Sequence, residues 1–375
     1  MSEINRRNFI TGAVGTLAAR SACAGSSDQD KGLRHLIDGG PLIGVALPHY
    51  FDSKFPKKGQ DLILKHFDSI TPENCMKWPG LSPEEGKFRF DRPDRMVQYS
   101  QRHGLKFVGH TLVFNREQNY PKWLFLEGGK QADPKLVWKR IEVHLEKLMG
   151  RYQGKIDSWD VLNEFVEVGD PGYRHTDFTK VLGADYPIRL FKMAAAIDPK
   201  AKLTYNDFAV EEKGRRMKIL AFIKKLQDAG CRVDVVGSQS HLELGQNTGD
   251  QVSETIEAFS KIGVKCAFTE VDVDVVSRKG HWNPKTREEN RKFNPYPDSC
   301  PDEILQKQAE VYGALMNAVM EQQKWVDRVT FWGLDDGHSW LNNWPWKRQN
   351  HGLLFDRDFN EKPAFQAVKK ALLKQ

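Results

Sequence analysis

Short apolar runs alternate with longer amphipathic stretches from about residue 40 to the end of the chain. Apolar residues in the longer stretches, such as 134–152 and 304–323, recur at spacings of three and four, the period of an α-helix. An eightfold repeat of strand and helix without a compositional break predicts one α/β domain, a (β/α)8 TIM barrel. The eight predicted strands are 42–47, 69–73, 106–113, 156–164, 202–208, 235–242, 266–273 and 329–334.

A doubly wound open sheet is the alternative architecture. Such a sheet normally has a glycine-rich turn after its first strand, and the residues at 44–48 do not form one. The region 277–300 interrupts the repeat because it is rich in Lys, Arg, Asn and Pro. A long loop at that position, after the seventh strand, is expected to shape a binding cleft.

Polar, titratable or aromatic residues gather where the predicted strands end. In a parallel barrel these ends meet on one face, where active sites are built. Buried polar groups are costly unless they are satisfied, so their accumulation at nearly every end favours an active site over isolated structural groups. The residues are Glu73, Asn74, Lys77, His110, Asn163, Glu164, Tyr205, Gln239, His241, Glu270, Asp272, Trp332 and Trp340.

The N-terminus has the order of an export signal. Arg6 and Arg7 precede a weakly apolar run, and small residues follow around Cys23. The paired arginines resemble a twin-arginine signal, so we expect residues 1–24 to be removed and 25–375 to form the catalytic domain. The expected location is periplasmic or secreted, with a lipid anchor at Cys23 as the alternative. The apolar run is too short for a stable membrane span, and no other stretch is apolar enough.

Composition narrows the choice of partners. The formal net charge is +6, and basic and acidic residues are mixed along most of the chain, so a nucleic-acid partner is not expected. The ten Trp residues include candidate flat platforms for sugar rings. A monomer is expected.

Four cysteines remain after the predicted processing. Their spacing is not that of a zinc site, and neither a metal nor another cofactor is expected. Free thiols are the favoured state, and a Cys231–Cys266 disulfide is the alternative because export permits one. The four are Cys75, Cys231, Cys266 and Cys300.

Two glutamates stand out among the polar strand ends. Glu164 ends the fourth predicted strand and Glu270 lies in the seventh, so a barrel would bring both to one mouth. A pair of carboxyl groups suits hydrolysis of a glycosidic bond, in which one protonates the leaving oxygen and the other attacks the anomeric carbon or activates water. His241, at the end of the sixth strand, is expected to touch the acidic residues of the seventh.

Several motifs occur together in an order that resembles glycoside hydrolase family 10, the endo-β-1,4-xylanases. The resemblance covers about residues 35–370, and the form around residues 335–340 is more typical of Gram-negative members. The motifs are Thr71-Pro72-Glu73-Asn74-Cys75-Met76-Lys77-Trp78, Gly109-His110-Thr111-Leu112-Val113, Trp159-Asp160-Val161-Leu162-Asn163-Glu164, Tyr205-Asn206-Asp207, Gln239-Ser240-His241-Leu242, Thr269-Glu270-Val271-Asp272, and Trp332-Gly333 with Ser339-Trp340.

The resemblance implies an endo-acting, retaining hydrolase of xylan. Glu270 would be the nucleophile and Glu164 the acid/base, while Asn163 would bind the 2-hydroxyl of the sugar. Asp272 would support the nucleophile indirectly. The other residues that the resemblance implies for substrate binding are Glu73, Asn74, Lys77, His110, Tyr205, Gln239, His241, Trp332 and Trp340.

The chain departs from the family pattern at three positions. Phe114 and Asn115 stand where Trp-His is common, and Phe208 stands where Tyr is common. The loss of an indole N–H and an imidazole is expected to weaken the central subsite or shift substrate preference. Lys347 and Arg348 are candidate contacts for acidic side groups of xylan, with a solvated loop as the favoured alternative. Hydrolysis of a β-1,4-glucan or an aryl cellobioside, and non-catalytic carbohydrate binding, remain alternative functions.

Overall fold

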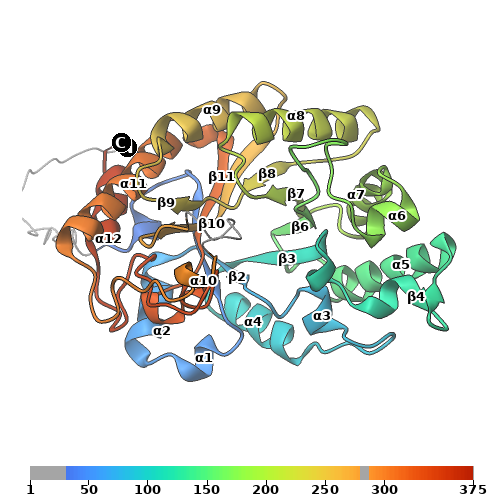
Figure 1. Cartoon of the computed structure of the whole chain (residues 1–375), viewed down its shortest axis with the longest axis horizontal. Helices are drawn as coiled ribbons and strands as arrows, with labels where there is room; N and C mark the ends of the chain where they lie inside the picture. The colour runs from blue at the N-terminus through green and yellow to red at the C-terminus, as the bar shows by residue number, and fades with distance from the viewer. Residues whose placement is uncertain (1–30, 279–286, 375) are drawn as a thin grey trace, which may run out of the picture. The chain divides into compact units, whose positions relative to one another are not determined.

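A closed sheet of parallel strands organises the protein (Figure 1). The computed structural model describes residues 31–278 and 287–374. Within these residues, β11 pairs with both β1 and β10, so the sheet closes into an eight-stranded barrel and the predicted fold is confirmed. The barrel strands are β1 (Leu42–Leu47), β2 (Ser69–Pro72), β3 (Lys106–Phe114), β6 (Ser158–Asn163), β7 (Lys202–Asp207), β8 (Val235–Ser238), β10 (Lys265–Asp274) and β11 (Val326–Phe331).

Helices follow the strands and surround the barrel (Figure 1). A short hairpin, β4 (Leu126–Glu127) with β5 (Lys130–Gln131), precedes α5. The helices are α1 (Phe51–Lys54), α2 (Lys57–His66), α3 (Trp78–Leu81), α4 (Asp91–Arg102), α5 (Pro134–Arg151), α6 (Asp177–Leu182), α7 (Tyr186–Ile197), α8 (Lys213–Asp228), α9 (Thr248–Ser260), α10 (Arg287–Asn290), α11 (Asp302–Glu321) and α12 (Pro363–Leu372).

Helix α5 shows how local sequence sets these boundaries. The side chain of Asp133 accepts a hydrogen bond from the amide of Lys135 at 2.7 Å, and Pro134 occupies the first helical position, where its missing N–H costs nothing. The buried residues Val137, Ile141 and Leu145 repeat at four and place one face of the helix in the core.

The sixth predicted strand is interrupted. Ser240 has a φ of +55°, in the left-handed region, and this residue separates β8 from the short strand β9 (His241–Glu243). Strand β9 pairs with β10 in a register that sets His241 opposite Asp272. The last predicted strand begins three residues earlier than expected, at Val326.

A buried ionic chain crosses the barrel interior. The guanidinium of Arg328 donates to Asp160 at 3.1 Å, and the other carboxylate oxygen of Asp160 lies 2.9 Å from Nδ1 of His110. All three side chains are almost fully buried. Buried charges are stable only when they are paired, and Asp160 is paired with Arg328. The carboxylate of Asp160 therefore stays in place and holds the imidazole of His110 in one orientation.

Several other expectations concern the ends and loops. The predicted export signal at 1–24, including Cys23, lies outside the described residues. The four cysteines at 75, 231, 266 and 300 are buried free thiols, so the favoured state is confirmed. In the described part of the 277–300 region, the carbonyls of Phe293 and Tyr296 accept hydrogen bonds from Trp346 and His351. No helix among the described residues has the length and apolar character needed to cross a membrane.

Candidate active site

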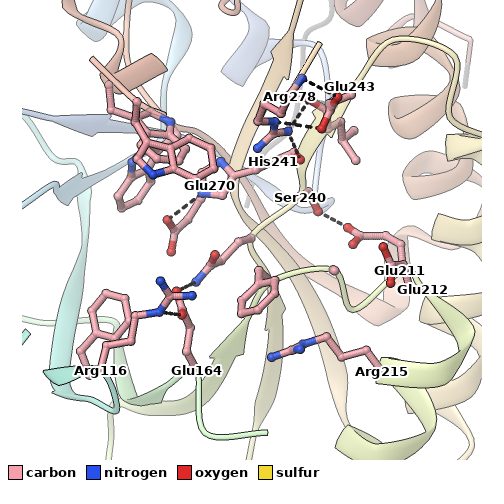
Figure 2. Close-up of a pocket in the computed structure, with 18 of the residues that line it drawn as sticks. Arg116, Glu164, Glu211, Glu212, Arg215, Ser240, His241, Glu243, Glu270 and Arg278 are labelled. Carbon is pink, nitrogen blue, oxygen red and sulfur yellow. Dashed lines mark hydrogen bonds and ion pairs between the residues drawn. The ribbon is translucent and has the colours of Figure 1, made fainter. Parts of the chain in front are cut away.

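A cavity of about 600 Å³ lies at the C-terminal ends of the barrel strands (Figure 2). Both Glu164 and Glu270 line it, so the structure brings the two predicted carboxylates into one pocket. From the 277–300 region only Arg278 lines it among the described residues, so the described part of that region contributes little to the cleft. The other predicted site residues that line the cavity are Lys77, His110, Gln239, His241, Trp332 and Trp340.

Glu270 is held by two donors. Nδ2 of Asn206 donates to its Oε1 at 2.8 Å. Nε2 of His241 lies 3.3 Å from its Oε2 (Figure 2). Burial would raise the pKa of Glu270, but the hydrogen bond from His241 and nearby positive charges, including Lys77, hold it below the ordinary value. The carboxylate is therefore kept ionised, as a nucleophile requires.

His241 is held from its other side by Asp272. The Nδ1 atom of His241 lies 3.0 Å from Oδ2 of Asp272, and Nε1 of Trp340 donates to that oxygen at 2.7 Å. Burial opposes a charged ring, yet the carboxylates of Asp272 and Glu270 raise the pKa of His241 to about 10. The imidazole therefore carries a proton on each nitrogen at neutral pH and donates to both acids.

Glu164 has different neighbours. Nε of Arg116 donates to its Oε2 at 2.5 Å, and Nε2 of Gln239 donates to its Oε1 at 3.1 Å (Figure 2). A second guanidinium, that of Arg174, lies 3.8 Å from Oε2. The side chain is 7% exposed, so these contacts lie in a largely dehydrated environment.

Backbone strain gathers at the same cavity. Glu164 has a φ of +57°, Ala209 of +50° and Ser240 of +55°, and all three residues line the cavity. A non-glycine residue in this region costs on the order of 1–3 kcal/mol and persists only where surrounding structure compensates. The main-chain amide of Glu164 donates to the carbonyl of Asn206 at 2.9 Å, which is one such compensation.

Aromatic rings form one wall of the cavity. The ring centroids of Trp340 and Trp344 are 4.8 Å apart in a stacked arrangement, and His241 lies 4.8 Å from Trp340. The ring of Trp332 meets His110 edge to face at 5.3 Å. The wall thus presents planar apolar surface beside hydrogen-bonding groups, the combination that suits a sugar ring.

Glu73 and Asn74 line a neighbouring cavity of about 540 Å³ rather than the main one. The ammonium of Lys77, which lines the main cavity, donates to Oδ1 of Asn74 at 3.1 Å and connects the two. Burial raises the pKa of Glu73 to about 7, against the opposing charge of Lys77. These three predicted residues therefore form one side of an extended cleft.

Two predicted binding residues lie deeper than expected. Tyr205 is fully buried, and its hydroxyl donates to Asp207 and accepts from the amide of Val166. The prediction that it binds substrate is wrong, because its hydroxyl is already used and it does not line the cavity. Asn163 is also buried and is absent from the cavity lining, but its Nδ2 has no hydrogen-bond partner in the structure and stays available for a sugar hydroxyl.

Comparison with known proteins places this site in a family. The model of glycosyl hydrolase family 10 matches residues 33–371. The chain belongs to glycosyl hydrolase family 10. An endo-1,4-beta-xylanase A of Xylanibacter ruminicola is 32% identical over 335 residues, which are 88% of this chain and 90% of that protein. A thermostable celloxylanase of Thermoclostridium stercorarium is 34% identical over 322 residues, 82% of this chain and 80% of that protein.

Solved structures agree with this family assignment. A family 10 endoxylanase retrieved from a sugarcane soil metagenome superposes with a TM-score of 0.84 at 32% identity. The match covers 91% of this chain and 99% of that chain. Because the match extends over almost all of the barrel, the family assignment applies to the whole described cavity.

Two of the departures from the family pattern have different consequences. Phe114 lines the cavity, where the ammonium of Lys77 lies 5.8 Å from its ring centroid. Asn115 is fully buried outside the cavity lining, and its Oδ1 accepts hydrogen bonds from Thr176 at 2.7 Å and Tyr186 at 3.1 Å. Any effect of Asn115 on sugar binding is therefore indirect.

Arg348 does not face the cleft. Its side chain is buried and donates to Asp274 at 2.5 Å, so both the candidate contact with acidic side groups of xylan and the favoured solvated loop are wrong for this residue. Lys347 is exposed and does not line the main cavity. The sequence of this hydrophilic loop does not indicate which of its charged residues forms a buried ion pair and which stays on the surface.

The prediction overlooked Asn206 and Arg116. Asn206 donates to Glu270 and also to Oδ1 of Asn163 at 2.8 Å, so it connects the two carboxylate segments. The motif that contains Tyr205 indicated that one of two adjacent residues faces the site, because adjacent residues of a strand point to opposite sides, but it did not indicate which one. Arg116 had no such signal, since only the folded loop after β3 brings it to Glu164.

Proposed function

We propose that this chain is an endo-acting, retaining xylanase that hydrolyses internal β-1,4-xylosidic bonds of xylan by double displacement. One observation carries the proposal: a single cavity holds Glu270, kept ionised by His241 and Asn206, and Glu164, which has no histidine partner. Two carboxyl groups in unlike environments suit the two roles of a glycosidase. The family to which the chain belongs supports the same reaction.

In the first step, Glu270 attacks the anomeric carbon while the bond to the leaving oxygen breaks. Glu164 gives its proton to that oxygen, and the sugar becomes an ester of Glu270. In the second step, Glu164 takes a proton from water, the oxygen of that water attacks the anomeric carbon, and the carboxylate of Glu270 is released. The unpartnered Nδ2 of Asn163 supports a role in binding the 2-hydroxyl during both steps.

The remaining cavity residues are assigned to sugar binding. Trp332 and Trp340 would stack on or crowd the sugar next to the cleaved bond, and His110 and Gln239 would read its hydroxyls. Lys77, with Glu73 and Asn74 beside it, would hold sugars on the glycone side. Crowding by the two indoles would disfavour a hydroxymethyl group at C5, which supports xylan over glucan.

Substitution of the two glutamates tests the assigned roles. Glu270→Ala should lower activity by several orders of magnitude on every substrate. Glu164→Ala should lose activity on xylan but retain cleavage of aryl xylosides whose leaving groups need no proton. A chain that only binds carbohydrate would show unchanged behaviour after both substitutions, and equal sensitivity of good and poor leaving groups would contradict the acid/base role.

Substrate preference is tested by comparing xylan with carboxymethyl-cellulose. One relative is named a celloxylanase, which makes the glucan alternative a specific one. The proposed function requires a higher kcat/KM on xylan. Faster turnover of the glucan would replace it with a β-1,4-glucanase.

We also propose that residues 1–24 direct export by a twin-arginine route and that 25–375 act as a monomer without nucleic acid. The sequence of Arg6-Arg7 followed by Phe9 supports the route. Mass spectrometry of the protein from a periplasmic or culture fraction should show a mature chain beginning near Gly25. A lipid-modified Cys23, or a full-length chain, would contradict this processing.

A further inference from the structure

Arg116 binds one carboxylate oxygen of Glu164, the residue assigned to proton transfer. Its Nε donates to Oε2 at 2.5 Å, while Gln239 donates to Oε1 at 3.1 Å (Figure 2). Both oxygens of the carboxylate therefore face N–H donors. A guanidinium has no acceptor, so a protonated Glu164 could not donate to Arg116, and their contact would lose its charge-assisted character. The observed arrangement suits an ionised Glu164 and not one that is ready to give its proton to a leaving oxygen.

The charge of Arg116 poses a second problem for catalysis. Among the described residues, Glu164 is the only carboxylate within ion-pair distance of Arg116. The neighbouring guanidinium of Arg174 also lies 3.5 Å from Glu167, so it keeps an acidic partner. When Glu164 becomes a neutral acid, Arg116 alone would be left without a counter-charge on a partly dehydrated wall, which is costly.

Arg116 is accessible to a ligand in the cavity. Its side chain is 34% exposed and lines the cavity. Arg215 also lines the cavity, but it is only 3% exposed and is bound to Asp207 at 2.9 Å. The guanidinium of Arg116 lies 5.8 Å from the ring centroid of Phe208, which also lines the cavity. The ring therefore flanks the guanidinium on the cavity wall.

We propose that Arg116 binds a carboxylate carried by the substrate on the leaving-group side, a uronic acid side group of xylan, and thereby releases Glu164 for proton donation. The inference deepens the proposed function and rests on it. The leaving-group side follows from geometry, because Arg116 contacts the residue assigned to protonate the leaving oxygen. An incoming carboxylate replaces Glu164 as the partner of the guanidinium, and paired Arg–carboxylate contacts are strong and directional.

The test uses one polymer with and without its charge. Wild-type enzyme is assayed on glucuronoxylan and on the same polymer after its carboxyl groups are reduced to alcohols, which preserves size and branching. The measured quantity is the ratio of the two kcat/KM values. The variants are Arg116→Gln, which removes the charge, and Arg116→Lys, which keeps the charge without the fork. The control is Lys147→Gln, which removes an equal charge from an exposed residue of α5 outside the cavity lining.

The wild-type ratio should favour the acidic polymer by about tenfold, as expected for a charge-assisted contact. Arg116→Gln should bring the ratio to about one, Arg116→Lys should give an intermediate ratio, and Lys147→Gln should keep the wild-type ratio. Thermal unfolding at wild-type temperature would show that each variant is folded. A wild-type ratio near one, or an unchanged ratio in Arg116→Gln, overturns the inference alone, whereas failure of the wild type on both polymers overturns the proposed function as well.

Discussion

Replacement of Asp272 by Asn removes a buried charge while it preserves shape. In the structure one oxygen of Asp272 accepts hydrogen bonds from His241 at 3.0 Å and from Trp340 at 2.7 Å. An amide oxygen can accept the same two bonds. The substitution therefore isolates the negative charge that holds the proton of His241.

The magnitude follows from the pKa of His241. Against the cost of burial, the two acids raise this pKa from 6.5 to about 10, which corresponds to about 5 kcal/mol in favour of the charged ring. The charge and hydrogen bond of Asp272 are the largest favourable contributions. Without them, the pKa of His241 should fall and the ring should lose its proton as pH rises. Its bond to Glu270 then becomes a neutral one, weaker by about 1–2 kcal/mol.

The second chemical step should respond most. Release of the sugar returns negative charge to Glu270, and a protonated His241 stabilises that charge. Turnover of an aryl β-xylobioside with a good leaving group makes this step rate-limiting. We expect kcat of Asp272→Asn to fall about 5–30-fold at neutral pH, to recover toward acidic pH, and to decline further as pH rises.

The surface variant Asp94→Asn, which breaks an ion pair with Arg151, is the matched control and should keep the wild-type profile. Wild-type enzyme should show no inflection from His241 below about pH 10. If kcat of Asp272→Asn stays within twofold of wild type from about pH 5 to 9, the charge of Asp272 does not act through His241 and the reasoning is refuted.

Three further predictions address the packing and the pH response. A Cβ at Gly237 would lie 2.4 Å from Oδ1 of Asn206, so Gly237→Ala should displace that amide and lower kcat by about tenfold or more. The control is Gly44→Ala, where the added Cβ is equally crowded but meets Ser and Thr side chains outside the cavity lining. This control should lose stability without the same loss of kcat per folded molecule. Burial lowers the pKa of His144 to about 3, so the unfolded chain binds more protons than the folded protein as pH falls below 6.5. Relative to His144→Gln, wild type should therefore lose about 2 kcal/mol of unfolding free energy between pH 7 and 5 in urea titrations. An equal pH response of both proteins would contradict this prediction. Because burial raises the pKa of Glu73 to about 7, kcat/KM on xylo-oligosaccharides should show an inflection near pH 7 that is absent in Glu73→Gln, and persistence of the inflection would assign it to another group.

The barrel was predictable because its information is local. Apolar runs and helical spacing are properties of consecutive residues, and β1 (Leu42–Leu47) has the predicted bounds. The strand ends were predictable for the same reason, since parallel strands must present their C-terminal ends together. Thus the prediction that Glu164 and Glu270 line one cavity needed little more than the order of the strands.

The contacts of single side chains were harder to predict from the sequence. Tyr205 and Asn206 are neighbours in one motif, but barrel register and strand pleat turn the first into the core and the second toward Glu270. The bend at Ser240 similarly determines where His241 meets Asp272. Such choices depend on the phase of a strand within the closed sheet, which no short sequence pattern specifies.

The order of residues along the chain thus accounts for the fold class, for the face that carries the chemistry and for the two glutamates, because periodicity and strand polarity are written in neighbouring residues. Three features depend on segments that are far apart in sequence: the pairing of Arg116 with Glu164, the pairing of His241 with Asp272, and the burial of Arg348. Long-range distances and dehydration determine these ion pairs, and both exist only once the barrel has closed.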